Sequence, residues 1–268
     1  MIDISVIMAT YRRPLSIVGA IQSILDQRDV EVEILVVDDC PDGSAEAIVR
    51  GIGDPRVRYM RNPHPSNRRP AVPRNVGWPL TSGEIVHFAD DDDFVPAGLY
   101  AHALDEFRRF PNIGIVFGSI EAFGESSQNL LEEQAMFARA ARRAKRLQWL
   151  NSTRAFTANL LFSELLFVGG SSLLRRRCLV ELGGLPTAIE IMEDVDFLAR
   201  ATRLFGVRYL NRPSLYYRIW PSMMHSQTDL QGALNRSYIR MQSDYRKRFG
   251  AFDFYLLKIL ARTLFRFI

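Results

Sequence analysis

The stretch Ile85-Val86-His87-Phe88-Ala89-Asp90-Asp91-Asp92-Asp93 changes abruptly from an apolar run to four carboxylates. The run has the length and composition of a buried strand, and turn residues precede it. Neighbouring carboxylates about 5 Å apart repel by about 3 kcal/mol per pair at an effective dielectric constant of about 20. In an extended chain Asp90 and Asp92 face one side, and the other two carboxylates face the opposite side. The stretch predicts either a solvated acidic turn or a site for Mg²⁺ or Mn²⁺.

Apolar runs with the length of strands alternate with helix-like segments through the first half of the chain. The predicted strands cover residues 4–8, 32–37, 57–60, 85–89 and 113–117. Helices are predicted from Pro14, from a Ser44 cap to Arg50, over residues 74–80 and over residues 96–110. The apolar face of the first helix comprises Leu15, Val18, Ile21, Ile24 and Leu25. Residues 62–73 contain four prolines and are predicted to form a loop.

This alternation is typical of α/β proteins in which helices flank a mostly parallel sheet. Ligands of such sheets bind beyond the carboxyl ends of the strands. Thr10, Asp38-Asp39 and residues 90–93 each follow the end of a predicted strand. If these strands are neighbours, their polar side chains converge on one edge of the sheet.

The second half departs from this alternation. Residues 123–166 have a helical composition and predict an insertion over the sheet, with a basic segment at Arg139, Arg142, Arg143, Lys145 and Arg146. A strand is predicted over residues 168–174 and a helix over residues 176–182, which Gly183-Gly184 ends. A helix over residues 194–205 and short strands at 207–210 and 215–218 follow.

Composition limits the class of protein. The chain has 268 residues, of which 47% are hydrophobic and 24% charged, as in ordinary globular proteins. Two cysteines, Cys40 and Cys178, indicate no disulfide framework and favour a reducing compartment. We expect no signal peptide and no membrane-spanning helix. Residues 237–268 carry seven Lys/Arg and two Asp/Glu, so the net charge of +4 belongs to the tail and does not indicate nucleic-acid binding.

No P-loop, dinucleotide-binding glycine motif, zinc-type cysteine spacing or hydrolase nucleophile motif is present. Five other motifs follow one another within about residues 3–220: Ser5-Val6-Ile7-Met8-Ala9-Thr10-Tyr11-Arg12-Arg13-Pro14, Val36-Val37-Asp38-Asp39, Pro73-Arg74-Asn75-Val76-Gly77, Phe88-Ala89-Asp90-Asp91-Asp92-Asp93, and the block from Gly170-Ser171-Ser172-Leu173-Leu174-Arg175-Arg176 through Gly183-Gly184 to Glu193-Asp194-Val195-Asp196. In type and order they resemble the family-2 glycosyltransferases of the GT-A fold, with residues 88–93 in the place of the DxD motif.

The resemblance implies a GT-A type α/β fold with a Rossmann-like sheet, a helical insertion and a C-terminal helical tail. It implies a nucleotide-sugar-binding half over residues 1–118. An acceptor-binding and catalytic half covers residues 119–228 and includes the insertion at about 123–166. Residues 229–268 then form basic amphipathic helices.

The resemblance also implies an inverting sugar transfer from a nucleotide-sugar, most simply a UDP-sugar, with Mn²⁺ or Mg²⁺ as cofactor. Asp39 is expected to accept a hydrogen bond from the pyrimidine N–H, and Thr10 and Tyr11 to line the nucleoside pocket. The remaining donor-side residues contact ribose, diphosphate and metal: Arg74, Asp90, Asp91 and Asp92, with Asp92 as the direct metal ligand. Asp38 has a structural alternative, in which it accepts hydrogen bonds from loop N–H groups.

Inversion in one displacement needs a base opposite the leaving group, and Asp194, beside Glu193, matches the family's catalytic carboxylate. The alternative for Asp194 is an ordinary helix cap. His225 stands where some relatives place a metal ligand, and a solvated loop histidine is its alternative. The Q-x-x-R-W block of processive synthases is absent after Asp194, since residues 197–202 read Phe-Leu-Ala-Arg-Ala-Thr. A single-addition transferase is therefore expected.

The tail has its own pattern. Lys258, Arg262 and Arg266 are four residues apart and share one helical face, among Leu, Ile and Phe. This pattern predicts either a helix in the interface of an anionic membrane or a terminal helix that docks on protein.

We therefore expect a cytoplasmic glycosyltransferase, peripheral on the inner face of the cell membrane if the tail binds lipid. Its acceptor is expected to be a glycan or a lipid-linked saccharide. A sugar-phosphate nucleotidyltransferase and a non-catalytic nucleotide-sugar-binding member of the family are the alternatives. The oligomeric state does not follow from the residues.

Overall fold

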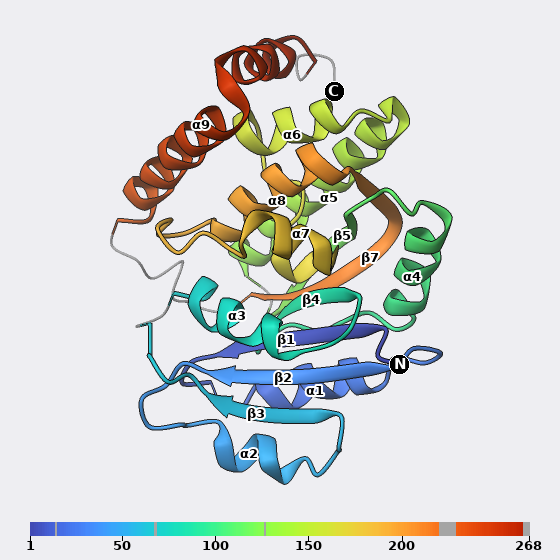
Figure 1. Ribbon diagram of the computed structural model, residues 1–268, viewed down its shortest axis with the longest axis vertical. Helices are drawn as coiled ribbons and strands as arrows, with labels where there is room; N and C mark the ends of the chain where they lie inside the picture. Colours follow the sequence, from blue (N-terminus) through green and yellow to red (C-terminus); the bar gives the residue numbers. More distant parts are fainter. Residues whose placement is uncertain (14, 67–68, 126, 220–228, 265–268) are drawn as a thin grey trace.

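The computed structural model describes residues 1–13, 15–66, 69–125, 127–219 and 229–264. Its centre is a seven-stranded sheet in the order β3-β2-β1-β4-β6-β5-β7 (Figure 1). The strands are β1 Ile4–Thr10, β2 Val32–Asp38, β3 Val57–Arg61, β4 Ile85–Asp90, β5 Ile115–Gly124, β6 Ser172–Arg175 and β7 Val207–Ile219. Helices cover both faces, which confirms the predicted α/β architecture.

Strands β1 to β4 are parallel neighbours, with β1 between β2 and β4. Their register aligns Thr10 with Asp38 and Ala9 with Asp90. The carboxyl ends of the three strands therefore lie at one edge of the sheet. This confirms the predicted convergence of the groups that follow them.

Two apolar cores, one on each face, explain why these strands are continuously apolar. Ile7, Leu35 and Val37 pack in the core that includes residues of α6 (Thr153–Phe162), α7 (Arg176–Leu182), α8 (Glu193–Phe205) and α9 (Leu230–Leu264). Val6 and Met8 point to the other face, where they pack with residues of α1 (Ile17–Leu25) and α4 (Leu99–Arg109). A strand buried on both faces needs apolar residues at every position rather than at alternate ones.

The helices of the first half confirm the predicted elements and correct their boundaries. They are α1 Ile17–Leu25, α2 Glu46–Gly51, α3 Ala71–Gly77, the 3₁₀ turn η1 Trp78–Leu80 and α4 Leu99–Arg109. The predicted apolar face of α1 was partly wrong, because Leu15 precedes the helix and Val18 is exposed, whereas Ile17 and Ala20 are buried. Helix α3 starts inside the predicted loop; Pro73 fits its first turn, where backbone N–H groups have no helical partner.

The predicted Ser44 cap was also wrong. The cap position of α2 is Ala45, and its N–H donates to the Asp38 carboxylate at 3.0 Å. The Ser44 hydroxyl instead donates to the Cys40 sulfur at 3.1 Å. A buried carboxylate at the end of β2 thus performs the capping that the sequence pattern assigned to a serine.

In the second half, β6 is antiparallel between β4 and β5, and β5 and β7 are parallel. Strand β5 continues to Gly124, past its predicted end at residue 117, so the insertion begins later than residue 123. The two short strands predicted after residue 207 form one strand, β7, with a register shift opposite residues 117–120. A Cβ on Gly118 would lie 2.3 Å from the Arg212 carbonyl oxygen, so a glycine is required at this irregularity.

The remaining helices are α5 Gln128–Leu150, α6 Thr153–Phe162, η2 Gly169–Ser171, α7 Arg176–Leu182, α8 Glu193–Phe205 and α9 Leu230–Leu264. Helix α9 turns sharply at Gly250, where φ is 85°, and its second part crosses the end of the molecule opposite β3 (Figure 1). Phe254, Leu257 and Ala261 pack in the core, so one face of the tail docks on protein. No helix in the described ranges is long and apolar enough to cross a membrane.

Candidate active site

The acidic turn begins where β4 ends, at Asp90. Asp91 Oδ2 accepts a hydrogen bond of 2.7 Å from the Thr10 hydroxyl, and its Oδ1 lies 3.6 Å from Arg13 Nη1. The same Arg13 nitrogen forms an ion pair with Asp92 Oδ2. The predicted alternation of the four carboxylates was therefore wrong, because the chain turns after Asp90 and brings Asp91 and Asp92 to one cation.

Burial dominates the electrostatics of this turn. It raises the pKa of Asp91 to about 7, raises the pKa of Asp92, and holds the pKa of Asp93 well above its ordinary value. In the part of the chain that the structure describes, the buried Oδ2 of Asp93 has no hydrogen-bond donor. Burial and the neighbouring carboxylates thus disfavour the ionised forms of these groups in the free protein.

Arg218, near the end of β7, contacts the acidic turn. Its backbone N–H donates to Asp93 Oδ1 at 2.8 Å, and its Nε donates to the Asp92 carbonyl at 3.0 Å. The guanidinium lies 5.1 Å from the ring centroid of Phe94 and 4.6 Å from that of Phe123. Strand β7 therefore fixes the backbone of the acidic turn.

Arg74 connects the acidic strand to the start of α8. Its side chain is only 5% exposed; Nη2 lies 2.6 Å from Asp90 Oδ1 and Nη1 lies 3.1 Å from Glu193 Oε1. Arg74 therefore lies beside the end of the acidic strand in space as well as near it in the sequence. Burial, and next the charge of Asp194, raise the pKa of Glu193 to about 7 despite this ion pair.

Asp194 is half-buried, and both of its oxygens accept backbone hydrogen bonds. Oδ2 accepts from Gly169 N at 2.7 Å, and Oδ1 accepts from Val195 N at 2.8 Å. The residue at the cap position of α8 is Met192, so the interpretation of Asp194 as an ordinary cap was wrong.

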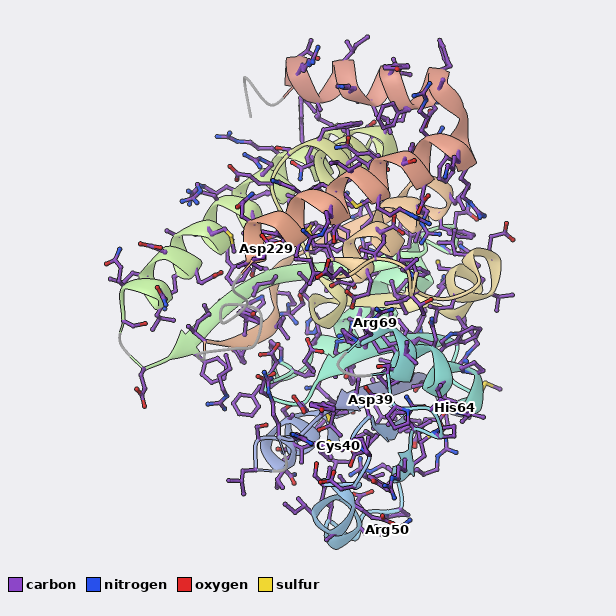
Figure 2. The ribbon with its side chains drawn as sticks, turned by 90° about the vertical axis from the view of Figure 1, so that its left-hand side faces the viewer. Asp39, Cys40, Arg50, His64, Arg69 and Asp229 are labelled. Atoms are coloured by element: carbon purple, nitrogen blue, oxygen red, sulfur yellow. The ribbon has the colours of Figure 1, made fainter. Side chains whose placement is uncertain are left out.

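Asp39 lies beside the loop that follows β3 (Figure 2). Its oxygens accept hydrogen bonds from Asn62 Nδ2 at 2.6 Å, Ser66 N at 3.0 Å and Ser66 Oγ at 2.7 Å. The Arg12 guanidinium lies 5.5 Å from the Tyr11 ring centroid. Tyr11 and Asp39 thus lie in the loops that follow β1 and β2, at the same sheet edge as the acidic turn, and the third predicted nucleoside-site residue, Thr10, ends β1.

Asp38 accepts hydrogen bonds from loop N–H groups, which was the structural alternative given for it. Its carboxylate accepts from Cys40 N at 2.9 Å, Ala45 N at 3.0 Å and the Tyr59 hydroxyl at 3.1 Å. These bonds hold the loop between β2 and α2. Asp38 therefore positions its neighbour Asp39, whose N–H donates to the Thr10 carbonyl at 2.9 Å.

The structure describes His87 but not His225. His225, the predicted metal ligand, lies in residues 220–228, outside the described residues. His87, within the acidic strand, is fully buried, with Nδ1 2.8 Å from the Tyr100 hydroxyl and Nε2 2.9 Å from the Gly170 carbonyl. Burial lowers the pKa of His87 to about 4, so its imidazole is neutral and structural.

Among the described residues, no three His, Cys, Asp or Glu side chains are arranged to hold a metal ion. The acidic turn nevertheless has the chemistry that a hard divalent cation requires, because it offers several carboxylate oxygens. Asp93 has an oxygen without a donor, and Arg13 already places a positive charge on Asp92. Asp90 and Asp92 are the residues that would hold the ion.

Sequence reasoning missed Arg13 and Arg218. Arg13 lies three residues beyond Thr10, so its proximity to the end of β1 was a usable signal. No local pattern marks Arg218, because its position depends on the register of β5 and β7.

The sequence model of a family described as "Glycosyl transferase family 2" matches residues 5–183. The chain belongs to this family. Succinoglycan biosynthesis protein ExoO of Rhizobium meliloti is 40% identical over 93 residues, which are 35% of this chain and 26% of that protein. The GalNAc(5)-diNAcBac-PP-undecaprenol beta-1,3-glucosyltransferase of Campylobacter jejuni is 34% identical over 131 residues, 47% of this chain and 41% of that protein. The chain thus spans less than half the length of either relative.

Solved structures share the fold. S. aureus TarS 1–349 in complex with UDP-GlcNAc superposes with a TM-score of 0.65 and 19% identity, over 90% of this chain and 66% of that one. The mannosyltransferase PcManGT of Pyrobaculum calidifontis, in complex with GDP-Man and Mn²⁺, gives a TM-score of 0.60 and 18% identity, over 91% and 64%. The family-2 glycosyltransferase therefore has the predicted GT-A type fold.

Proposed function

We propose that this chain is an inverting, metal-dependent glycosyltransferase that moves one sugar per reaction from a UDP-sugar to a glycan or lipid-linked saccharide. The observation that carries the proposal is that buried Arg74 forms ion pairs with two carboxylates. They join Asp90, on the donor side, to Glu193, beside the carboxylate Asp194. The residues proposed to bind the donor and the residue proposed as the base thus lie next to each other at one edge of the sheet. This arrangement suits direct transfer of the sugar from donor to acceptor in one displacement.

On the donor side, Thr10, Tyr11 and Asp39 would bind the nucleoside. Asp39 would accept the pyrimidine N–H, and Asp91, bonded to Thr10, would support the ribose side. Asp90 and Asp92 would hold Mn²⁺ or Mg²⁺, and His225 would complete the ligand set. When bound, the metal would offset the negative charge that develops on the departing diphosphate. Arg74 would provide a further fixed positive charge next to Asp90.

Asp194 would act as the general base for the acceptor hydroxyl. Each carboxylate oxygen accepts one backbone hydrogen bond and retains a lone pair for the proton. The two amide bonds fix the direction of the carboxylate, and Glu193 positions it by holding Arg74 at the other side. Inversion follows if the acceptor approaches from the face opposite the diphosphate.

The comparisons support the class of donor and acceptor. TarS was solved with UDP-GlcNAc and PcManGT with GDP-Man and Mn²⁺. The name of the C. jejuni relative describes an undecaprenol-linked saccharide and a glucosyltransferase activity. We infer a cytoplasmic enzyme that meets its lipid-linked acceptor at a membrane surface and adds a single hexose.

The test is sugar transfer by the full chain with Mn²⁺, UDP-sugars and lipid-linked or soluble saccharide acceptors. Asp194→Asn should reduce the rate by about 10²–10⁴-fold while the UDP- and Mn²⁺-induced shift of the midpoint of thermal unfolding stays unchanged. The midpoint itself should fall slightly, because Asn has one acceptor oxygen for the two backbone N–H groups. Asp244→Asn, which removes an exposed ion pair with Arg240, is the matched control and should retain full activity. Full activity of Asp194→Asn would refute the assignment.

The same assay separates the other two functions. Formation of a nucleotide-sugar from a sugar phosphate and a nucleoside triphosphate would identify a nucleotidyltransferase. Binding of donor and Mn²⁺ without transfer or donor hydrolysis would identify a non-catalytic member of the family.

A further inference from the structure

Helix α9 presents an exposed apolar stripe after its turn at Gly250. Four side chains spaced three and four residues apart face outward, with exposed fractions of 85% for Phe252, 48% for Tyr255, 37% for Leu256 and 59% for Ile259. The opposite face is buried against the core. The helix is thus held on the protein by one face while the other is available for a second contact.

The attachment of this helix is firm. Asp253 Oδ1 and Oδ2 accept from Arg203 Nη2 and Nε at 2.9 and 3.0 Å, and the Tyr245 hydroxyl donates to Oδ2 at 2.8 Å. Phe254 packs edge-on against Phe162 of α6, with ring centroids 5.3 Å apart. The exposed stripe therefore belongs to a rigid element of the fold.

The start of α6, which follows the end of α5, contacts this helix. Trp149 is 86% exposed, and Arg154, five residues later, lies 3.4 Å from Asp253, the neighbour of Phe252. Both views place the second part of α9 over α6 at the same end of the molecule (Figures 1 and 2). An exposed tryptophan thus lies on the segment that leads directly into the helix beneath the stripe.

The second half of α5 and the second part of α9 are also basic. Residues 135–150 of α5 contain five Lys/Arg and no Asp/Glu. Arg139, Arg142 and Arg146 are exposed at spacings of three and four residues, which continue to Trp149. On α9, Arg262 is exposed and Lys258 is partly exposed, while the acidic Asp253 is neutralised within the protein. Aromatic and aliphatic side chains surrounded by cations match the headgroup region of an anionic bilayer.

We propose that this end of the molecule, formed by the second part of α9 and the end of α5, docks on an anionic lipid surface. Phe252, Leu256, Ile259 and Trp149 enter the headgroup region, and the cations contact lipid phosphates. A second copy of the chain fits this surface less well than lipid does, because a symmetric dimer contact would bring the cations of the two copies together. The inference deepens the proposed function, since a lipid-linked saccharide is presented at such a surface.

The test is cosedimentation of the full chain with phosphatidylcholine vesicles, with and without phosphatidylglycerol. Phe252→Ser combined with Ile259→Ser should weaken binding to anionic vesicles at least about tenfold, because two apolar side chains lose their burial. Lys258→Gln with Arg262→Gln should weaken it by about fivefold per charge at low salt. The matched control is Ile239→Ser, since Ile239 is 70% exposed on the first part of the same helix and should not matter.

Tryptophan fluorescence gives a second readout. Anionic vesicles should shift the emission of the wild-type protein to shorter wavelength, and Trp149→Phe should remove most of the shift while retaining much of the binding. The proposal is overturned by absence of wild-type binding to anionic vesicles, or by equal binding of the Phe252/Ile259 variant. Dimerisation that the same variant abolishes, without vesicle binding, would also overturn it and assign the stripe to a second copy. Vesicle binding needs no donor, metal or turnover, so its failure and that of the proposed transferase are distinguishable.

Discussion

Two buried acidic sites in this protein have opposite electrostatics. Asp253, in α9, receives hydrogen bonds from Arg203 and Tyr245 and contacts Arg154. These bonds, Arg203 first, lower the pKa of Asp253 to about 2. In the acidic turn after β4, burial raises the pKa of Asp91 to about 7, and the nearby cation Arg13 is one-third exposed.

The difference separates a carboxylate that is compensated by cations from carboxylates that burial leaves less well compensated. A structural carboxylate is fully compensated, because an unpaired buried charge destabilises the fold. In the acidic turn three neighbouring carboxyl groups have raised pKa values. A cation bound beside them would stabilise their ionised forms. In the free protein, burial and mutual repulsion of these carboxylates destabilise the turn, and a bound divalent cation would reduce that destabilisation.

The largest expected effect concerns stability. Asp253→Asn should lower the free energy of unfolding by about 3 kcal/mol, because Arg203 and Arg154 lose their common partner. Asp92→Asn should leave this free energy unchanged or raise it, because one of several repelling carboxylates is removed. Urea denaturation of both variants without metal measures the difference. If the two variants lost the same free energy of unfolding, the proposed difference between the two sites would be wrong.

A smaller effect is expected from pH. Folding raises the pKa of Asp91 and Glu193 to about 7, whereas both titrate at about 4 in the unfolded chain. Between about pH 4 and pH 7 the folded state therefore binds more protons, and stability falls as pH rises, by at most about 1.4 kcal/mol per pH unit for each proton. Asp253 acts oppositely: its contribution is complete above about pH 4 and is lost as pH falls towards 2.

Urea denaturation at about pH 5 and pH 7 measures this dependence, with Asp91→Asn as the variant in which the decline should be smaller. Greater stability of the metal-free wild type at the higher pH would contradict the expectation.

The smallest expected effect concerns metal affinity. Arg13 forms an ion pair with Asp92, and a metal ion bound to that carboxylate must displace it. Since the Arg13 side chain is 34% exposed, the ion pair contributes about 1 kcal/mol or less. Arg13→Gln should therefore strengthen Mn²⁺ binding in the absence of nucleotide by up to about fivefold. Calorimetric titration measures this, with Arg12→Gln as the control; weaker binding by Arg13→Gln would show that Arg13 supports the metal site.

Local patterns predicted most of the elements and the edge at which they act. The apolar runs predicted β1 to β4, and the alternation of strands and helices predicted their parallel arrangement. Errors occurred where a tertiary contact overrides a local signal. Asp38 caps α2 in place of Ser44, and β5 and β7 continue past their predicted ends because they pair with each other.

The sequence by itself determined that carboxylates follow the strands β2 and β4, because burial on both faces demands apolar runs and ligand-binding groups can only follow where the runs end. Only the tertiary structure decided how those charges are compensated. Arg13, Arg74 and the backbone N–H of Arg218 reach the acidic groups from 16 to 125 positions away in the chain. Electrostatic compensation depends on distance in space and on burial, and neither is encoded in the spacing of residues along the chain.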